Sequence, residues 1–83
     1  MFHKVKNVTP YLDYTIYVEF QNGEKRNYDI NPLFSKWMPF NSLKEINGLF
    51  QQVKVDTGGY GISWNDEIDL ECNELYYNGV ETE

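Results

Sequence analysis

Cysteine and histidine each occur once in this chain, and long apolar runs are absent. Cys72, the only cysteine, cannot form an internal disulfide, which fits a reducing compartment. His3, the only histidine, lies near the N-terminus, where we expect a solvated strand residue rather than a catalytic base. No apolar run approaches the length that spans a bilayer, and no apolar signal segment follows Met1. We therefore expect a cytoplasmic protein that does not contact a membrane.

Positive charge is missing from the last third of the chain. The formal net charge is −6, and Lys54 is the last basic residue. Such a surface repels nucleic-acid phosphates, so we predict no nucleic-acid binding by this chain alone. It would attract the basic surface of a protein partner, although solubility is the alternative explanation. The carboxylates after Lys54 are Asp56, Asp66, Glu67, Asp69, Glu71, Glu74, Glu81 and Glu83.

The sequence contains no recognisable reaction motif. The glycines of residues 58–61 are not followed by Gly-Lys-Ser/Thr, as a phosphate-binding loop requires. Residues 65–69 resemble a calcium loop only faintly, because Leu70 and Tyr76 replace its required glycine and glutamate. The carboxylates around Cys72 disfavour a reactive thiolate. We predict no catalytic residues, no metal site and no cofactor, and hence a protein that is not an enzyme.

The apolar pattern predicts one small α+β domain over residues 1–83, with a sheet of about five short, mostly antiparallel strands. The clearest strand is Tyr14–Phe20, where apolar residues alternate with polar ones. Asn22-Gly23 predicts a tight hairpin leading into a return strand at Lys25–Ile30. Further strands are predicted at Phe2–Val8, with a bulge, and at Gln51–Asp56, Tyr60–Trp64 and Glu67–Glu71.

Two short helices are predicted to cover one face of this sheet. The first, Leu33–Trp37, follows an Asn31 N-cap and ends at Pro39. The second, Leu43–Phe50, begins with the capping-box spacing of Ser42 and Glu45. A last helical turn around Leu75 precedes a frayed end at residues 80–83. The predicted core consists of Ile16, Val18, Phe20, Leu33, Phe34, Leu43, Ile46, Phe50, Val53, Val55, Ile62 and Leu70.

The candidate binding residues are Tyr60, Trp64, Asp66 and Asp69. Tyr60 and Trp64 could stack on a ring, but stacking platforms usually alternate with Lys or Arg, so core packing is the favoured role of Trp64. Asp69 could accept backbone N–H bonds at the start of the last helical turn or recognise a partner. The structural role is favoured for Asp69.

The block Gly-Tyr-Gly-Ile-Ser-Trp at residues 59–64, followed by Ile-Asp-Leu at 68–70 and Leu-Tyr at 75–76, resembles domain-of-unknown-function family 2442. Upstream, Asn-Gly-Glu at 22–24, Tyr-Asp at 28–29, Pro-Leu at 32–33 and Val-Lys-Val at 53–55 extend the resemblance. It implies a small bacterial α+β protein without an assigned activity. It also implies that a neighbouring gene encodes a second small protein, which suggests a toxin–antitoxin-like pair. The helix-turn-helix of some longer relatives is not found in this sequence.

Three functions therefore remain open at the level of sequence. The first is a non-enzymatic interaction module that binds the neighbouring gene's product through a basic surface of that partner, with an antitoxin-like role as one form of it. The second is a small-ligand-binding domain or minor enzyme that uses Tyr60, Trp64 and Asp69. Nucleic-acid binding is the third and least favoured. The oligomeric state is left open.

Overall fold

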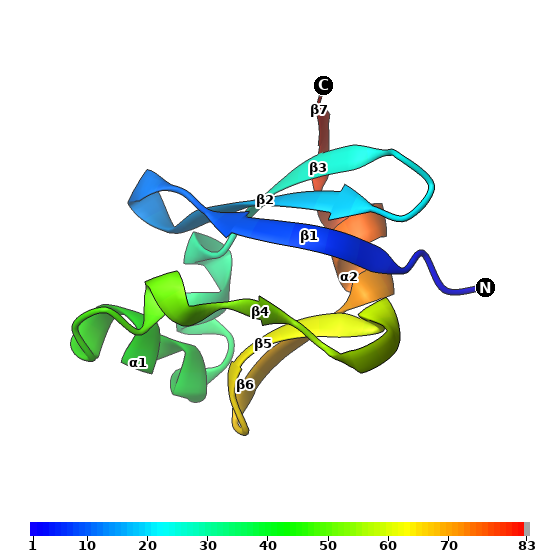
Figure 1. Ribbon diagram of the computed structural model, residues 1–83. Coiled ribbons are helices and arrows are strands. Elements are labelled where there is room, and N and C mark those ends of the chain that lie inside the picture. The colour runs from blue at the N-terminus through cyan, green and yellow to red at the C-terminus, as the bar shows by residue number, and fades with distance from the viewer. Residues whose placement is uncertain (83) are drawn as a thin grey trace.

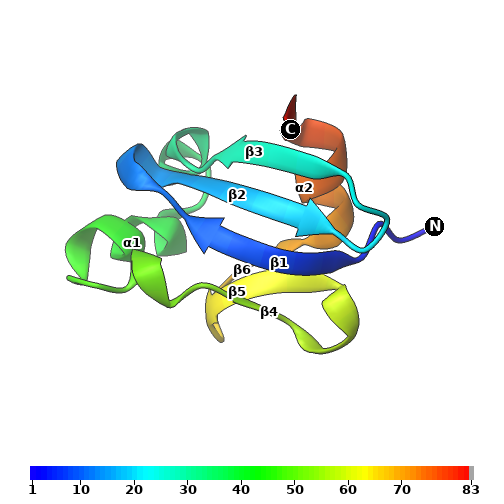
Figure 2. The same cartoon turned by 45° about the horizontal axis from the view of Figure 1, so that its top comes forward.

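A computed structural model of the protein describes residues 1–82, which form two antiparallel sheets (Figure 1). The larger sheet has the order β1-β2-β3-β7, and the smaller has the order β4-β5-β6. Figures 1 and 2 both show β1 running beside β4, so the sheets are neighbours. The α+β class is confirmed, although the described residues form seven strands in two sheets where one sheet was predicted. The strands are β1 (Val5–Pro10), β2 (Thr15–Phe20), β3 (Lys25–Asp29), β4 (Lys54–Val55), β5 (Gly61–Asn65), β6 (Ile68–Glu71) and β7 (Val80–Thr82).

The predicted hairpin is the centre of the larger sheet. β2 pairs with β3 so that Ile16 stands opposite Tyr28, and both side chains are buried. β1 pairs with the other edge of β2 and continues to Pro10. Its register shifts between Val5 and Asn7, which confirms the predicted bulge.

The turn between β1 and β2 has an unusual backbone. Asp13 and Tyr14 have φ values of 62° and 59°, in the left-handed region that side chains disfavour. The Tyr14 ring packs edge-on against Phe34 and Phe50, at centroid distances of 5.3 and 5.1 Å, and so holds the turn against the core.

The first predicted helix, Leu33–Trp37, is instead a 3₁₀ turn, η2 (Asn31–Ser35). Asn31 does not cap it but is its first residue, and the residue at the N-cap position makes no side-chain capping hydrogen bond. The Asn31 side-chain amide donates to Asp29 Oδ1 and to the Asp13 carbonyl. Trp37 is extended, with φ −133° and ψ 110°. Pro39 then lies in the first turn of a second 3₁₀ segment, η3 (Met38–Asn41), where a proline is tolerated. Pro39, predicted to end a helix, therefore lies at the beginning of the next helical segment.

The second predicted helix, Leu43–Phe50, is reduced to the single turn α1 (Ser42–Glu45). No side chain caps its start, so the predicted capping box does not form. Ile46 is extended, with ψ 112°, and its side chain is 53% exposed, which contradicts its predicted place in the core. A further 3₁₀ turn, η4 (Phe50–Gln52), follows. A helix this short has little intrinsic stability, so tertiary packing decided the outcome.

The C-terminal part is more ordered than predicted. Helix α2 (Cys72–Asn78) confirms the last helical turn and runs between the two sheets (Figure 1). Val80–Thr82 are not frayed but form β7, which pairs with β3. Glu83 lies outside the described residues.

The core joins both sheets and α2. Of the predicted core residues, Phe34, Val53 and Val55 are only partly buried, and eight are buried: Ile16, Val18, Phe20, Leu33, Leu43, Phe50, Ile62 and Leu70. The sequence-based list omitted further buried residues, namely Val5, Tyr28, Ile30, Phe40, Leu49, Trp64, Ile68, Cys72 and Leu75.

The turn before β5 yields a test of backbone packing. Gly59 has φ +81°, and a Cβ atom there would lie 2.6 Å from the Val5 carbonyl oxygen. Gly23 has a similar φ of +91° but open space around it. We expect Gly23→Ala to lower the free energy of unfolding by about 1 kcal/mol, and Gly59→Ala by about 2 kcal/mol or more. Urea unfolding followed by tryptophan emission measures both, and equal losses would contradict the predicted close contact.

Candidate binding groove beside strand β6

The structure does not bring the four predicted binding residues together. Trp64 is buried on β5, which agrees with its favoured core role, while Asp66 lies exposed at the tip of the β5–β6 turn. Asp69 is exposed on β6. Tyr60 is half exposed but packs near the N-terminus, with its ring 5.2 Å from that of Phe2. Only Asp69 borders a hollow in the surface that also contains an exposed aromatic ring.

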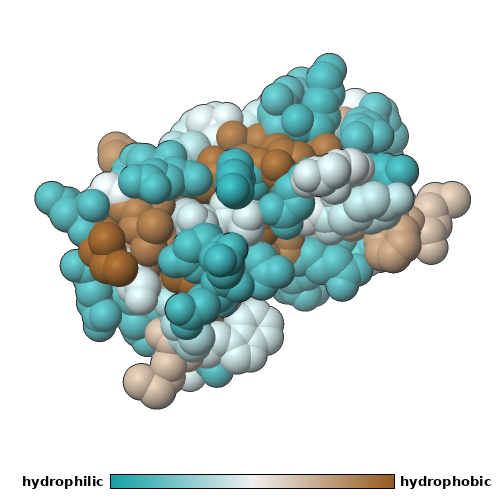
Figure 3. All heavy atoms as spheres, turned by 60° about the horizontal axis from the view of Figure 1, so that its bottom comes forward, coloured by the Kyte–Doolittle hydropathy of each residue, from teal (hydrophilic) through white to brown (hydrophobic). Residues whose placement is uncertain are grey.

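That hollow, which we call the β6 groove, has a volume of about 440 Å³. Its lining includes the exposed side chains of Trp37 and Met38 together with the acidic residues Glu67 and Asp69. Figure 3, in which the bottom of Figure 1 is turned toward the viewer, shows hydrophobic residues (brown) gathered between hydrophilic ones (teal). The lining residues are Lys36, Trp37, Met38, Pro39, Phe40, Glu67 and Asp69.

Local sequence explains why these side chains face the groove. η2 ends at Ser35 and η3 begins at Met38, with Pro39 in its first turn, where the missing N–H of proline costs little. Trp37 therefore lies on the extended link between the two 3₁₀ segments. On β6 the side chains alternate, with Ile68 buried and Asp69 exposed. The sequence reading missed Trp37 because it placed this residue on the inner face of a helix. The available signal was Pro39, because proline favours the first turn of a new helical segment as well as the end of an old one.

Aromatic rings form a continuous layer beneath the groove. The Trp37 and Phe40 rings are 5.8 Å apart, and Phe40 and Trp64 meet edge-on at 6.0 Å. Trp64 Nε1 donates a hydrogen bond of 3.0 Å to the carbonyl of Phe50, whose ring stacks on Trp64 at 6.2 Å. Buried aromatic pairs of this kind have defined geometry, so the floor of the groove is firmly supported. Trp64 thus acts below the site rather than in it.

A second hollow, of about 530 Å³, adjoins the groove and shares Lys36 and Trp37 with it. There the Tyr28 hydroxyl donates to Glu74 Oε2 at 2.7 Å, and the Asn78 amide donates to Oε1 at 2.9 Å. Burial, and then the bond to Glu74, raises the pKa of Tyr28 far above its ordinary value. Glu74 is therefore engaged in holding α2 against β3.

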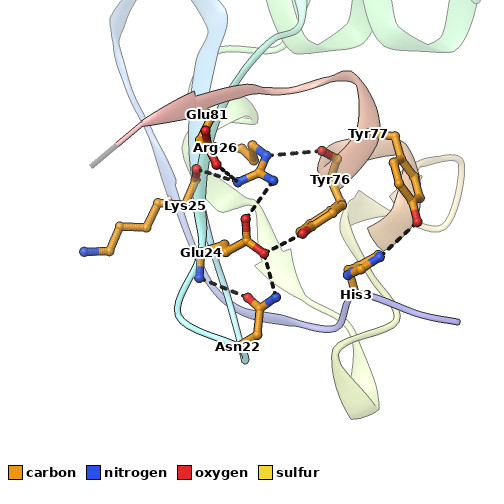
Figure 4. A network of polar contacts seen from close by, with 8 residues as sticks. All are labelled: His3, Asn22, Glu24, Lys25, Arg26, Tyr76, Tyr77 and Glu81. Atoms are coloured by element: carbon orange, nitrogen blue, oxygen red, sulfur yellow. Dashed lines mark hydrogen bonds and ion pairs between the residues drawn. The ribbon is translucent and has the colours of Figure 1, made fainter.

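Polar contacts also tie the β2–β3 hairpin to α2 (Figure 4). The buried Arg26 donates to Glu24 Oε1 at 3.1 Å and to the Tyr76 carbonyl at 3.2 Å. The Tyr76 hydroxyl donates to the other Glu24 oxygen. These bonds, that from Tyr76 first, hold the pKa of Glu24 below its ordinary value. The Glu24 bond likewise raises the pKa of Tyr76.

The Tyr76 ring lies between two other planar groups. The Arg26 guanidinium lies 4.3 Å from the ring centroid, and the His3 imidazole stacks on it at 3.6 Å (Figure 4). His3 also shares a hydrogen bond of 3.0 Å with the Tyr77 hydroxyl. The prediction of a solvated strand residue is therefore wrong for His3, which is packed against α2.

Other chemical features of the described residues are few. Cys72 is buried, and burial raises the pKa of its thiol. Among residues 1–82, no three His, Cys, Asp or Glu side chains are grouped so that they could hold a metal ion. No helix within these residues combines the length and apolar character needed to cross a membrane.

The two tryptophans should respond differently to a quencher. Trp37 is 50% exposed, whereas Trp64 is 5% exposed. We expect Trp37→Phe to leave a blue-shifted emission that acrylamide quenches weakly. Trp64→Phe, the matched variant, should leave a red-shifted emission that is quenched strongly. The reverse order would contradict the exposure of Trp37 in the groove and the burial of Trp64 beneath it.

The raised pKa of Tyr28 predicts a loss of stability in alkali. The unfolded phenol ionises near its ordinary pKa of 10.0, whereas the folded phenol stays protonated. The contribution of Tyr28 is therefore complete below that pH and is lost as the pH rises above it. Tyr28→Phe should cost about 1 kcal/mol at neutral pH through the lost hydrogen bond, yet show a shallower alkaline decline. Urea unfolding at a series of pH values measures both effects, and parallel declines would refute the assignment.

Comparisons with known proteins identify the family of the chain. A family model described as "Protein of unknown function (DUF2442)" matches residues 5–81. This match confirms the resemblance seen in the sequence, and no curated protein or solved structure matches the chain. The turns, strands and groove described above all lie within the matched residues or at their border. The chain belongs to the DUF2442 family of proteins of unknown function.

Proposed function

We propose that this protein is a non-catalytic interaction module that binds a basic segment of a protein partner through the β6 groove. The observation that carries the proposal is that the exposed Trp37 lines the same groove as the acidic residues Glu67 and Asp69. Exposed aromatic side chains in a supported pocket are the usual anchors of protein interfaces. Carboxylates beside such an anchor favour a cationic partner and raise the rate of encounter.

The charge distribution supports the same class of partner. No cation follows Lys54 in the sequence, and the net charge of −6 repels acidic surfaces. Lys36 is the one cation among the groove residues. The product of the neighbouring gene is the first partner to test, and an antitoxin-like role is one form that such a regulatory pair would take. Cytoplasmic location remains part of this proposal.

Binding of a small ligand by Tyr60, Trp64 and Asp69 has less support. The Trp64 ring is buried between Phe40 and Phe50, and its N–H is already bonded. Tyr60 packs against Phe2 instead of facing Asp69. A catalytic role for these residues would need them in one cleft.

Two pairs of variants test the proposal against the neighbouring gene's product. Trp37→Ala should weaken binding by about thirtyfold, while Tyr60→Ala, which removes a similarly exposed aromatic ring elsewhere, should not. Asp69→Asn should weaken binding several-fold at low salt, while Asp66→Asn, the same change at the hairpin tip, should have little effect. Calorimetric titration measures the dissociation constants. Circular dichroism confirms that each variant is folded.

Two outcomes would contradict the proposal. One is the absence of a complex with wild-type protein at micromolar concentration and low salt. The other is equal weakening by the groove variants and their matched controls, since binding would then depend on overall charge and not on this groove. Loss of stability with unchanged binding in Asp69→Asn would return that residue to the structural role favoured by sequence.

A further inference from the structure

We infer that the partner segment binds as an extended strand, which pairs with the free edge of β6 and carries Lys or Arg at alternate positions. This inference rests on the proposed function and specifies its partner more closely. Adding a strand to an exposed sheet edge is a common mode of peptide recognition, in which backbone bonds give affinity and alternate side chains give specificity.

The first observation is the position of β6 in the smaller sheet. β6 pairs with β5 along one side, where Leu70 stands opposite Ile62 and Asp69 opposite Ser63. Within residues 1–82, no strand pairs with its other side. An edge strand presents N–H and C=O groups that another chain can bond. The edge is short, four residues, so a paired segment would also be short.

The second observation is the chemistry of the alternate side chains. Ile68 and Leu70 are buried beneath the sheet, while Asp69 and Glu71 are exposed on the other face. A strand paired with β6 would place alternate side chains beside these two carboxylates. Opposite charges in such cross-strand positions are stabilising, so Lys or Arg is favoured at every second residue of the partner.

The same carboxylates disfavour a second copy of this chain as the occupant. Two β6 strands paired edge to edge would bring Asp69 and Glu71 of one copy close to those of the other. Like charges in cross-strand positions are destabilising. Many edge strands are protected from self-association by lysine. Here the protecting charge is negative, so the edge remains open to a basic strand.

The β6 groove supplies a place for one of the cationic side chains. Its apolar residues, among them Trp37 and Phe40, suit the aliphatic stem of Lys or Arg, and the indole face favours a cation. Glu67 and Asp69 would then meet the charged head. Lys36 borders the same groove and opposes this contact. Lys36→Ala should therefore tighten binding by a few-fold, in contrast with the other groove variants.

Synthetic heptapeptides test the inference directly. The first probe is Thr-Lys-Val-Lys-Val-Lys-Thr with blocked ends, and the second has the same composition with the three lysines adjacent. Two further probes are the alternating peptide N-methylated at its lysines or at its valines. Because successive N–H groups of a strand point to opposite sides, only one methylated form should lose its bonds to β6. Calorimetry gives affinities, and amide hydrogen exchange reports protection at residues 68–71.

The expected result has three parts. The alternating peptide should bind at least about tenfold tighter than the peptide with adjacent lysines, since both carry the same charge. One N-methylated isomer should lose binding while the other retains it. Amide exchange should slow at residues 68–71 and remain unchanged at the Tyr60 surface.

Failure of the inference can be distinguished from failure of the proposed function. Equal binding of both N-methylated isomers, or of the alternating and adjacent peptides, would overturn strand pairing. Absence of peptide binding, with the neighbouring gene's product still bound through Trp37, would also overturn it but leave the proposed function standing. If neither the peptides nor that product bound, both would fall.

Discussion

The placement of the two sheets and helix α2 relative to one another depends on the contacts of the buried Arg26 guanidinium. The guanidinium joins the turn before β3, through Glu24, to the backbone and ring of Tyr76 on α2. Because α2 connects the last strand of the smaller sheet to β7 of the larger, this contact helps to fix how the sheets meet. A buried charge that loses its partners is strongly destabilising, so each member of this network constrains the others.

Two groups of carboxylates in this acidic chain have different roles. Glu24 and Glu74 accept hydrogen bonds from tyrosine hydroxyls and fasten α2 to the larger sheet. Glu67 and Asp69 line the groove beside an exposed indole. Net charge alone could not distinguish these groups, because it counts engaged and free carboxylates equally. Because the two groups lie in different places, only Glu67 and Asp69 of these four are available to a partner in the β6 groove.

Prediction from sequence succeeded where the signal was local and failed where tertiary packing decided. The β2–β3 hairpin followed from strict alternation, and Trp64 was rightly favoured for the core. Ile46 was misplaced because the helix predicted over Leu43–Phe50 ends after Glu45, and so short a helix has little stability of its own. Asp69 was named as a binding candidate without its neighbour Trp37, since their proximity joins segments about thirty residues apart. The hydrophobic periodicity of a sequence predicts local elements and does not predict a contact between distant segments.

The turn of Asp13 and Tyr14 has a consequence for how much stability the fold holds in reserve. Tyr14 adopts a conformation that asparagine and glycine adopt at lower cost, whereas the aspartate at position 13 tolerates it better. The Tyr14 ring, which packs edge-on against Phe34 and Phe50, gives tyrosine an advantage over asparagine and glycine at this position. In this turn, aromatic packing of the Tyr14 side chain offsets an unfavourable backbone conformation. The register of β1 against β2 is consequently fixed by a side chain as well as by the turn. If β1 slid along β2, the Tyr14 ring would have to leave its contacts with Phe34 and Phe50.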